Sequence, residues 1–232
     1  MNLSILVQHV TKRFGRTFAL RDFSLAVPHG IVMGILGPNG SGKSTLMRIL
    51  AGVQRPDWGR VEVLGQTPGA CTKARVAFVP EIDHLYRWMD VREALDFTAS
   101  FWDDFDYARA EELLAFTGLK RENRIADLSK GLKARLKLVI AMSRKADVVL
   151  LDEPLSGIDP VSRERVLQGI VQGYRPGEAT VLITTHLVRE VEPLLDRVAF
   201  MRDGELVLEG EVETLRRERG RSLEQIYREV LA

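Results

Sequence analysis

The sequence has little cysteine, almost no net charge and no long apolar run. Of its 232 residues only Cys71 carries a thiol, which excludes a scaffold held by disulfides. The 33 basic and 32 acidic residues leave a formal charge of +1, without the basic excess typical of nucleic-acid-binding proteins. We therefore expect no nucleic-acid partner. Apolar runs such as Val148–Leu151 are far shorter than the roughly 18 residues that a membrane-spanning helix needs.

Targeting signals are also lacking. The N-terminus has a short apolar stretch but neither a basic start nor a small-residue cleavage site. We therefore expect a cytoplasmic protein that another polypeptide would hold at a membrane if it works there. The chain contains no repeat and no Ser/Gly linker, and its 45% hydrophobic and 28% charged residues are typical of a globular protein. Residues 1–232 are accordingly predicted to form one domain.

Short apolar runs alternate with segments of helical spacing, which predicts an α/β fold with a mostly parallel sheet. The stretch at about 82–136 is helical throughout, and we interpret it as an insert into a core of about 1–81 and 137–232. Strands are expected at 5–7, 23–27, 31–36, 61–64, 76–79, 148–151 and 180–184, helices at 44–53, 91–105, 107–119, 129–142, 160–174, 187–195 and 222–231, and a hairpin at 198–210 with its turn at Asp203-Gly204.

A phosphate-binding motif follows the third predicted strand. Residues 37–45 read GPNGSGKST and match G-x-x-x-x-G-K-[ST] at Gly37, Gly42, Lys43 and Ser44. The glycines let backbone N–H groups turn toward one anion, and the next helix points its N-terminus at the phosphates. Lys43 would reach the β- and γ-phosphates of ATP, and Ser44 would place its hydroxyl on Mg²⁺. The predicted binding residues are Gly37, Pro38, Asn39, Gly40, Ser41, Gly42, Lys43, Ser44 and Thr45.

Acidic residues and a histidine follow two later strands. Asp152 and Glu153 end the run VVLLDEP, and His186 ends VLITTH. Because the carboxyl ends of parallel strands share one edge of a sheet, these side chains should lie beside the phosphate loop. We predict that Asp152 holds Mg²⁺, that Glu153 orients or polarises the attacking water, and that His186 contacts the γ-phosphate.

Together these motifs resemble the ATP-binding subunits of ABC transporters, in the family order and over essentially the whole chain. Glu81 lies where the family has its glutamine loop and, as a carboxylate near the γ-phosphate, would act through the metal or a bound water. Ser129 and Gly131, in LSKGL, occupy the family signature. The resemblance further assigns Phe14 to adenine stacking, Asp159 to the D-loop, Asp152 and Glu153 to the metal-binding and catalytic acids, and His186 to the switch histidine.

The resemblance implies a P-loop NTPase fold of the ABC-ATPase type. This fold has a RecA-like core, an antiparallel β subdomain and an inserted helical subdomain. Two such domains would close head to tail around two ATP molecules, as a homodimer or as a heterodimer with a related subunit. ATP hydrolysis with Mg²⁺ would power a separate polytopic membrane permease, which would place this chain peripherally on the cytoplasmic face of the cell membrane.

Three residues depart from the family pattern. Glu81 replaces a glutamine, Lys130 replaces the first glycine of the signature pair, and Leu132 replaces its final glutamine. The Glu81 and Lys130 variants, in VPE and LSKG, are similar to those in ATP-binding subunits that serve ABC-2-type permeases, many of which are exporters. Tyr86, Trp88 and Met89 are candidates for docking the permease, although ordinary core packing explains them equally well.

Two basic residues stand at the start of the helix that Ser129 is predicted to cap. Lys130 and Lys133 lie where the helix dipole disfavours cations, which suggests that an anion docks there. A solvated basic helix face is the alternative explanation.

Two other functions stay open. One is a soluble ABC ATPase outside transport, of the iron–sulfur assembly type. The other is a nucleotide-dependent binding module with low turnover.

Overall fold

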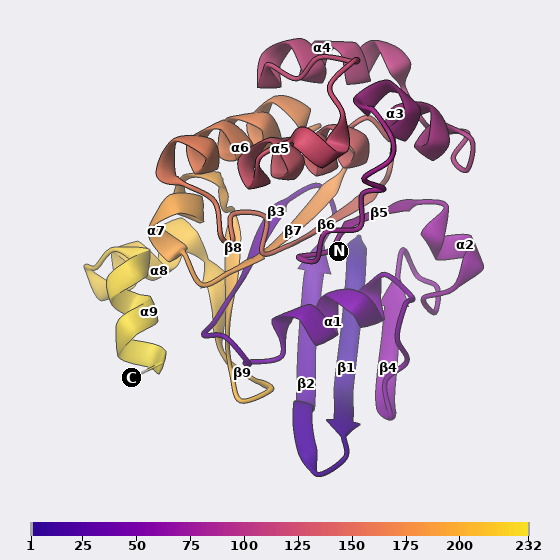
Figure 1. The fold of residues 1–232 in the computed structure, drawn as a ribbon. Helices are drawn as coiled ribbons and strands as arrows, with labels where there is room; N and C mark the ends of the chain where they lie inside the picture. The colour runs from indigo at the N-terminus through magenta and orange to yellow at the C-terminus, as the bar shows by residue number, and fades with distance from the viewer. Residues whose placement is uncertain (1, 232) are drawn as a thin grey trace.

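Two β-sheets organise the chain, and the computed structural model describes residues 2–231 of it (Figure 1). A three-stranded antiparallel sheet has the order β2 (Thr17–Pro28), β1 (Leu3–Phe14), β4 (Trp58–Val63). A six-stranded sheet has the order β5 (Val76–Val79), β6 (Val148–Asp152), β7 (Thr180–Thr185), β3 (Val32–Leu36), β8 (Arg197–Arg202), β9 (Glu205–Glu211). Its first five strands run parallel, and β9 returns antiparallel to β8.

Most of the helices cover the six-stranded sheet on the side away from the antiparallel sheet (Figure 1), whereas the first helix packs on the other side, between the two sheets. The helices are α1 (Lys43–Leu50), α2 (Ala70–Lys73), α3 (Val91–Ala99), α4 (Tyr107–Thr117), α5 (Lys130–Met142), α6 (Pro160–Gly173), α7 (Val188–Val191), α8 (Val212–Arg219) and α9 (Leu223–Leu231), with short 3₁₀ turns at Ile125–Asp127 and Glu192–Leu194. None of the helices within 2–231 combines the length and apolar character needed to cross a membrane.

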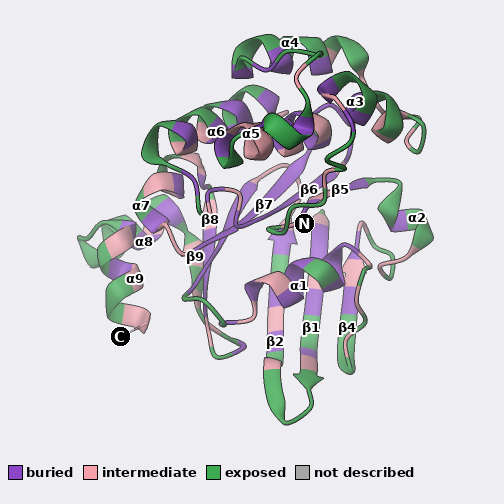
Figure 2. Ribbon diagram, in the orientation of Figure 1, coloured by how far each residue is buried: buried purple, intermediate pink, exposed green. Residues whose placement is uncertain are grey.

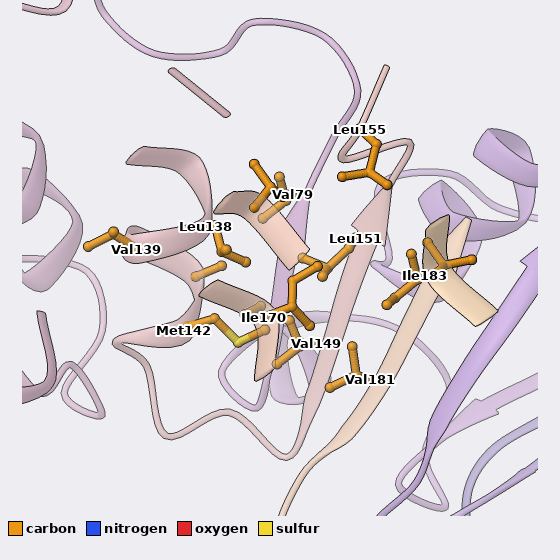
Figure 3. Close-up of a cluster of buried hydrophobic side chains, with 14 of the residues drawn as sticks. Val79, Leu138, Val139, Met142, Val149, Leu151, Leu155, Ile170, Val181 and Ile183 are labelled. Carbon is orange, nitrogen blue, oxygen red and sulfur yellow. The ribbon is translucent and has the colours of Figure 1, made fainter. Parts of the chain in front are cut away.

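The central strands are buried on both faces, which explains their continuous apolar sequence (Figure 2). Val149 and Leu151 of β6 pack against α5 and α6 (Figure 3). Val148 and Leu150 point the other way, into a second apolar cluster with β1, β2 and α1. One five-residue strand therefore supplies both halves of the core, because successive side chains of a strand point to opposite faces.

The fold class predicted from the sequence is confirmed. The parallel core, the antiparallel sheet and the group of helices α3, α4 and α5 are all present. The expected hairpin turn is also found, with φ values of 51° at Asp203 and 84° at Gly204. Positive φ at both central residues is the geometry that Asp-Gly hairpin turns favour. The boundaries of the helical insert, near residues 82 and 136, stay a prediction.

Two helix predictions were partly wrong: one helix is shorter than expected, and the other is interrupted. The helix expected over 91–105 ends at Ala99. Beyond Ala99 two residues contact Arg144 instead of continuing the helix. The centre of the Trp102 ring lies 4.0 Å from the guanidinium carbon, and the Asp104 carboxylate accepts hydrogen bonds from the guanidinium. The helix expected over 187–195 is broken into α7 and a 3₁₀ turn because Pro193 cannot continue an α-helix.

Arg144 connects the helical layer to the edge of the six-stranded sheet. Its side chain is buried, and its Nε and Nη2 donate to both oxygens of Asp104 at 2.9 and 3.0 Å. Its Nη1 donates to the carbonyl oxygen of Val76 at 2.9 Å, and Nη2 also donates to that of Ala74 at 2.6 Å. A guanidinium supplies five N–H donors in one plane, so a single side chain satisfies all of these acceptors.

We expect Arg144→Leu to destabilise the fold by about 3 kcal/mol, because it leaves the Asp104 charge and two backbone carbonyls without their donor. Urea unfolding of the full chain measures the change. Arg175→Leu is the control for a more exposed arginine nearby. An Arg144→Leu variant as stable as the wild type would show that this contact is not important for the fold.

Candidate functional site

Four neighbouring strands end at the same edge of the six-stranded sheet. β5, β6, β7 and β3 are adjacent and parallel, with Asp152 of β6 opposite Thr184 of β7 and Leu36 of β3 opposite Thr185. The residues that follow these strands are Glu81, Glu153, His186 and the loop at 37–42. The sheet thus brings together side chains that are more than 140 residues apart in the sequence.

The phosphate loop lies tightly against neighbouring backbone. Gly42 has a φ of 103°, and a Cβ there would stand 2.1 Å from the carbonyl oxygen of Ala19 in β2. A Cβ on Gly37 would stand 2.3 Å from the carbonyl oxygen of Met201 in β8. Only glycine fits at both places. The loop leads directly into α1, whose first backbone N–H groups are free to face an anion.

Lys43, Glu153 and His186 form a chain of charged and polar contacts. The Lys43 ammonium is buried, donates to the carbonyl oxygens of Gly37 and Pro38 at 2.8 and 3.0 Å, and lies 3.1 Å from Glu153 Oε1. His186 Nδ1 lies 3.1 Å from Glu153 Oε2. Because an ionised carboxylate only accepts hydrogen bonds, Nδ1 carries the hydrogen in this contact.

The backbone of Glu153 is strained. Its φ is 47°, in the left-handed region, which costs a non-glycine residue about 1 kcal/mol or more. Thr184 holds it there: the Glu153 N–H donates to the Thr184 hydroxyl at 2.9 Å and to the Thr184 carbonyl at 3.1 Å. In this backbone conformation the Glu153 carboxylate contacts Lys43 and His186.

Ser44 and Asp152 form the oxygen-rich part of the site. The hydroxyls of Ser44 and Thr184 donate to the same oxygen of Asp152, at 3.0 and 2.7 Å. Burial raises the pKa of Asp152 above its usual value, and the charges of Glu81 and Glu153 raise it further, while the two hydroxyl hydrogen bonds lower it. A cation beside Asp152 would relieve this crowding of negative charge.

The donor set fits Mg²⁺. Hydroxyl and carboxylate oxygens are the ligands that this ion prefers, and it commonly takes one or two protein oxygens together with substrate phosphates. Among residues 2–231 no three acids, histidines or cysteines gather to hold a metal by themselves. Phosphate oxygens would therefore have to complete the coordination.

A cavity of about 340 Å³ opens over the loop and contains most of the predicted nucleotide contacts. Phe14 is 52% exposed at its rim, and the ammonium of Lys12 lies 5.7 Å from the centre of the Phe14 ring. Glu81 also lines it and accepts a hydrogen bond from the hydroxyl of Ser156 at 3.3 Å. The predicted residues that line it are Phe14, Asn39, Gly40, Gly42, Lys43, Ser44, Thr45, Glu81 and Glu153.

The predicted residues of the signature and the D-loop form a separate group. Ser129 caps α5 by accepting the Leu132 N–H at 3.2 Å, and Asp159 caps α6 by accepting the Ser162 N–H at 3.0 Å. Gly131 packs on α6, where a Cβ would stand 2.3 Å from the Ser162 hydroxyl oxygen. None of the three borders the 340 Å³ cavity. The structure therefore does not bring Ser129, Gly131 and Asp159 to the phosphate loop of the same chain.

Lys133 has a partner within the chain, which weakens one argument from the sequence. Its ammonium lies 2.9 Å from a carboxylate oxygen of Asp83. A docked anion is therefore not needed to explain a cation in the first turn of α5.

Two contributors were missed by sequence reasoning. Thr184 orients both acids, and the signal for it was a polar residue inside the apolar run VLITTH. Lys137 of α5 donates to the backbone carbonyls of Pro80, Glu81 and Ile82. The sequence carried no signal for this contact, because a lysine on a helix usually faces solvent.

Comparison with known proteins identifies a family and several relatives. The family described as ABC transporter matches residues 20–156, more than half of the chain. An uncharacterized ABC transporter ATP-binding protein of Synechocystis sp. is 35% identical over 83% of this chain and 56% of its own length. A Nod factor export ATP-binding protein I of Burkholderia orbicola is 36% identical over 88% of this chain and 69% of its own length.

Solved structures share the fold. The ATP-binding subunit of an ABC transporter superposes with a TM-score of 0.86 at 24% identity, over 98% of this chain and 99% of that one. A dimeric ATP-binding cassette in a post-hydrolysis state with ADP and Pi gives a TM-score of 0.79 at 22% identity, over 89% and 98%.

The curated relatives are longer than this chain. It spans 56% of the Synechocystis protein and 62% of a similar protein of Nostoc sp.. The family match nevertheless includes the phosphate loop, Asp152 and Glu153, and the alignment with the Burkholderia protein extends over 88% of the chain. The chain therefore belongs to the ABC transporter family, of which it carries the ATP-binding domain.

Proposed function

We propose that this chain hydrolyses ATP with Mg²⁺ at the interface of a head-to-tail dimer, and that a separate polytopic membrane permease of the ABC-2 exporter type uses the resulting motion. The observation that carries the proposal is the contact chain Lys43–Glu153–His186 beside the Ser44–Asp152 pair. The exporter assignment is supported by relatives named Nod factor export ATP-binding proteins.

Lys43 is the residue through which ATP would act on Glu153. The ammonium donates to two loop carbonyls and lies 3.1 Å from Glu153 Oε1, with which it forms an ion pair. A γ-phosphate would compete with Glu153 for the charge of this ammonium and release one carboxylate oxygen. His186 would still hold the other oxygen, so Glu153 would stay in position to accept a proton from the attacking water.

The protein side of the metal site is built from Ser44, Asp152 and, through water, Glu81. Mg²⁺ bound there would neutralise phosphate charge. Thr184 keeps the Asp152 carboxylate in place by donating to its Oδ1. Phe14, exposed at the rim of the cavity, would stack on the adenine ring.

The separation of the signature residues supports a dimeric site. Ser129, Gly131 and Asp159 lie apart from the phosphate loop of their own chain. In a head-to-tail dimer, a homodimer or a heterodimer, they would face the ATP of the partner. The γ-phosphate would then join Lys43 of one chain to the start of α5 of the other, and hydrolysis would remove the group that favours the closed state.

An exposed aromatic surface supports the permease as partner. Tyr86 and Trp88 are 50% and 74% exposed, and the ring of Tyr86 also contacts Phe97 of α3 at 5.5 Å. Aromatic side chains gathered on a surface favour protein contacts. Met89 does not belong to this surface because it is buried in the core. A permease docked here would keep the chain peripheral on the cytoplasmic face of the membrane.

We expect Glu153→Gln to bind ATP, dimerise and release phosphate about 100-fold more slowly than the wild type, because the amide cannot accept a proton. Steady-state phosphate release measures the rate, and Lys43→Ala is the control without turnover. Wild-type turnover in Glu153→Gln would contradict the role of Glu153. A wild-type rate no higher than that of Lys43→Ala would instead favour the low-turnover binding module.

We expect Asp152→Asn to lower Mg²⁺-dependent turnover about 100-fold or more, through the loss of the charged metal ligand. Its melting temperature without nucleotide should equal or exceed that of the wild type. The pKa of Asp152 is raised in the fold, so its ionisation costs stability as the pH rises through that pKa. Calorimetry at pH 5 and pH 8 tests this, with the gain larger at pH 8. A gain that is larger at pH 5 would contradict it.

We expect a tagged chain, purified from gently solubilised membranes of its native cell, to retain a polytopic membrane protein at a constant ratio. Trp88→Ala should reduce this recovery, because it removes the most exposed ring of the aromatic surface. Trp58→Ala, an equally conspicuous exposed tryptophan on β4, is the matched control. Recovery of soluble partners alone would favour the non-transport ATPase.

A further inference from the structure

Lys137 makes an unusual set of contacts on the inner face of α5. Its Nζ lies 3.0 Å from the carbonyl oxygen of Pro80, 3.2 Å from that of Glu81 and 3.1 Å from that of Ile82. These are three consecutive backbone acceptors, and an ammonium has three N–H donors. All of its donor capacity is therefore directed at one turn of the loop that follows β5.

The Lys137 side chain is half-buried. Burial lowers the pKa of Lys137, while the carboxylates of Asp83, Glu81 and Asp152 act against that change. Partial burial of a charged group is unfavourable unless hydrogen bonds compensate for it. An aliphatic side chain would fill the same space without the cost of partly burying a charge. The hydrogen bonds that Lys137 donates therefore explain why a lysine stands at this position.

Few other contacts hold the loop, apart from Leu85, which packs against the core. Residues 80–85 form no helix or strand. Lys133, one turn earlier in α5, pairs with Asp83 at 2.9 Å and is the second contact between this helix and the loop. Within the loop, Glu81 is the residue that reaches the ATP cavity, where its carboxylate accepts a hydrogen bond from Ser156.

We propose that Lys137 is a positioning residue, which fastens the Glu81 loop to α5 and thereby sets the place of the Glu81 carboxylate during ATP hydrolysis. The proposal rests on the ATPase function proposed above. Within residues 2–231, the hydrogen bonds of Lys137 go to backbone carbonyls of this loop and not to the phosphate loop, Asp152 or Glu153, so it acts through the backbone of Glu81. The same helix begins at Ser129, about 12 Å away along its axis, so the loop and the signature share one rigid element.

Three variants of the full-length chain test the proposal. Lys137→Met keeps a long apolar stem and removes every donor. Lys137→Gln keeps an amide that can donate to part of the set. Lys145→Met is the matched control, because Lys145 is an exposed lysine just beyond the same helix, paired with Asp106 at 3.3 Å. Hydrogen exchange of residues 80–88 without nucleotide is measured first, and kcat and KM for ATP are measured second.

We expect exchange at 80–88 to be about tenfold faster in Lys137→Met and unchanged elsewhere, because the loop loses its main attachment. We expect kcat to fall about tenfold with KM within about twofold, since the Phe14 and phosphate-loop contacts with ATP remain. Lys137→Gln should recover part of both losses, and Lys145→Met should match the wild type.

Unchanged exchange at 80–88 in Lys137→Met, or faster exchange throughout the chain, would overturn the positioning role and leave the proposed function intact. A rise in KM that accounts for the whole loss would overturn it as well. If the wild type shows no turnover above Lys43→Ala, the proposed function itself fails, and the role of Lys137 in hydrolysis fails with it.

Discussion

Parallel hydrogen bonding between β5, β6, β7 and β3 brings four loops to one edge of the sheet. These strands are short and mostly buried, so apolar residues on both faces hold them in place. The loops that follow them contain the catalytic and binding groups, and a shift of one strand by a residue would exchange its two faces. The chemistry at this edge therefore depends on the same packing that stabilises the core.

Charge is distributed unevenly at this edge. Asp152, Glu153 and Glu81 lie close together, and the buried ammonium of Lys43 is the cation in direct contact with one of them. Two hydroxyl groups donate to one oxygen of Asp152, and the His186 imidazole contacts the second oxygen of Glu153. Such an arrangement favours a ligand that brings a divalent cation together with phosphate oxygens. The electrostatics and the glycine-lined loop thus support the same ligand, ATP with Mg²⁺.

Contacts between the helices and the sheet connect this edge to more distant surfaces. Arg144 joins the end of α5 to β5 through backbone carbonyls, and Lys137 joins the middle of α5 to the loop after β5. Lys137 donates to main-chain oxygens, and Arg144 donates to two main-chain oxygens as well as to the Asp104 carboxylate, so both contacts depend on the position of the backbone. A movement of the Glu81 loop would therefore move α5 with it, together with the helix start at Ser129.

The sequence alone determined the fold class, the phosphate loop and the order of the acids, because these depend on local patterns: glycine spacing, strand alternation and the residues that end apolar runs. It did not reveal the end of α3 at Ala99, the strained φ of Glu153, or the roles of Thr184, Arg144 and Lys137. Each of these depends on partners that lie 30 to 70 residues away in the chain and become neighbours only when the sheet and helices pack. The tertiary structure also decided that Ser129 and Asp159 lie apart from the phosphate loop, because α5 and α6 pack on the sheet with these two caps away from the cavity.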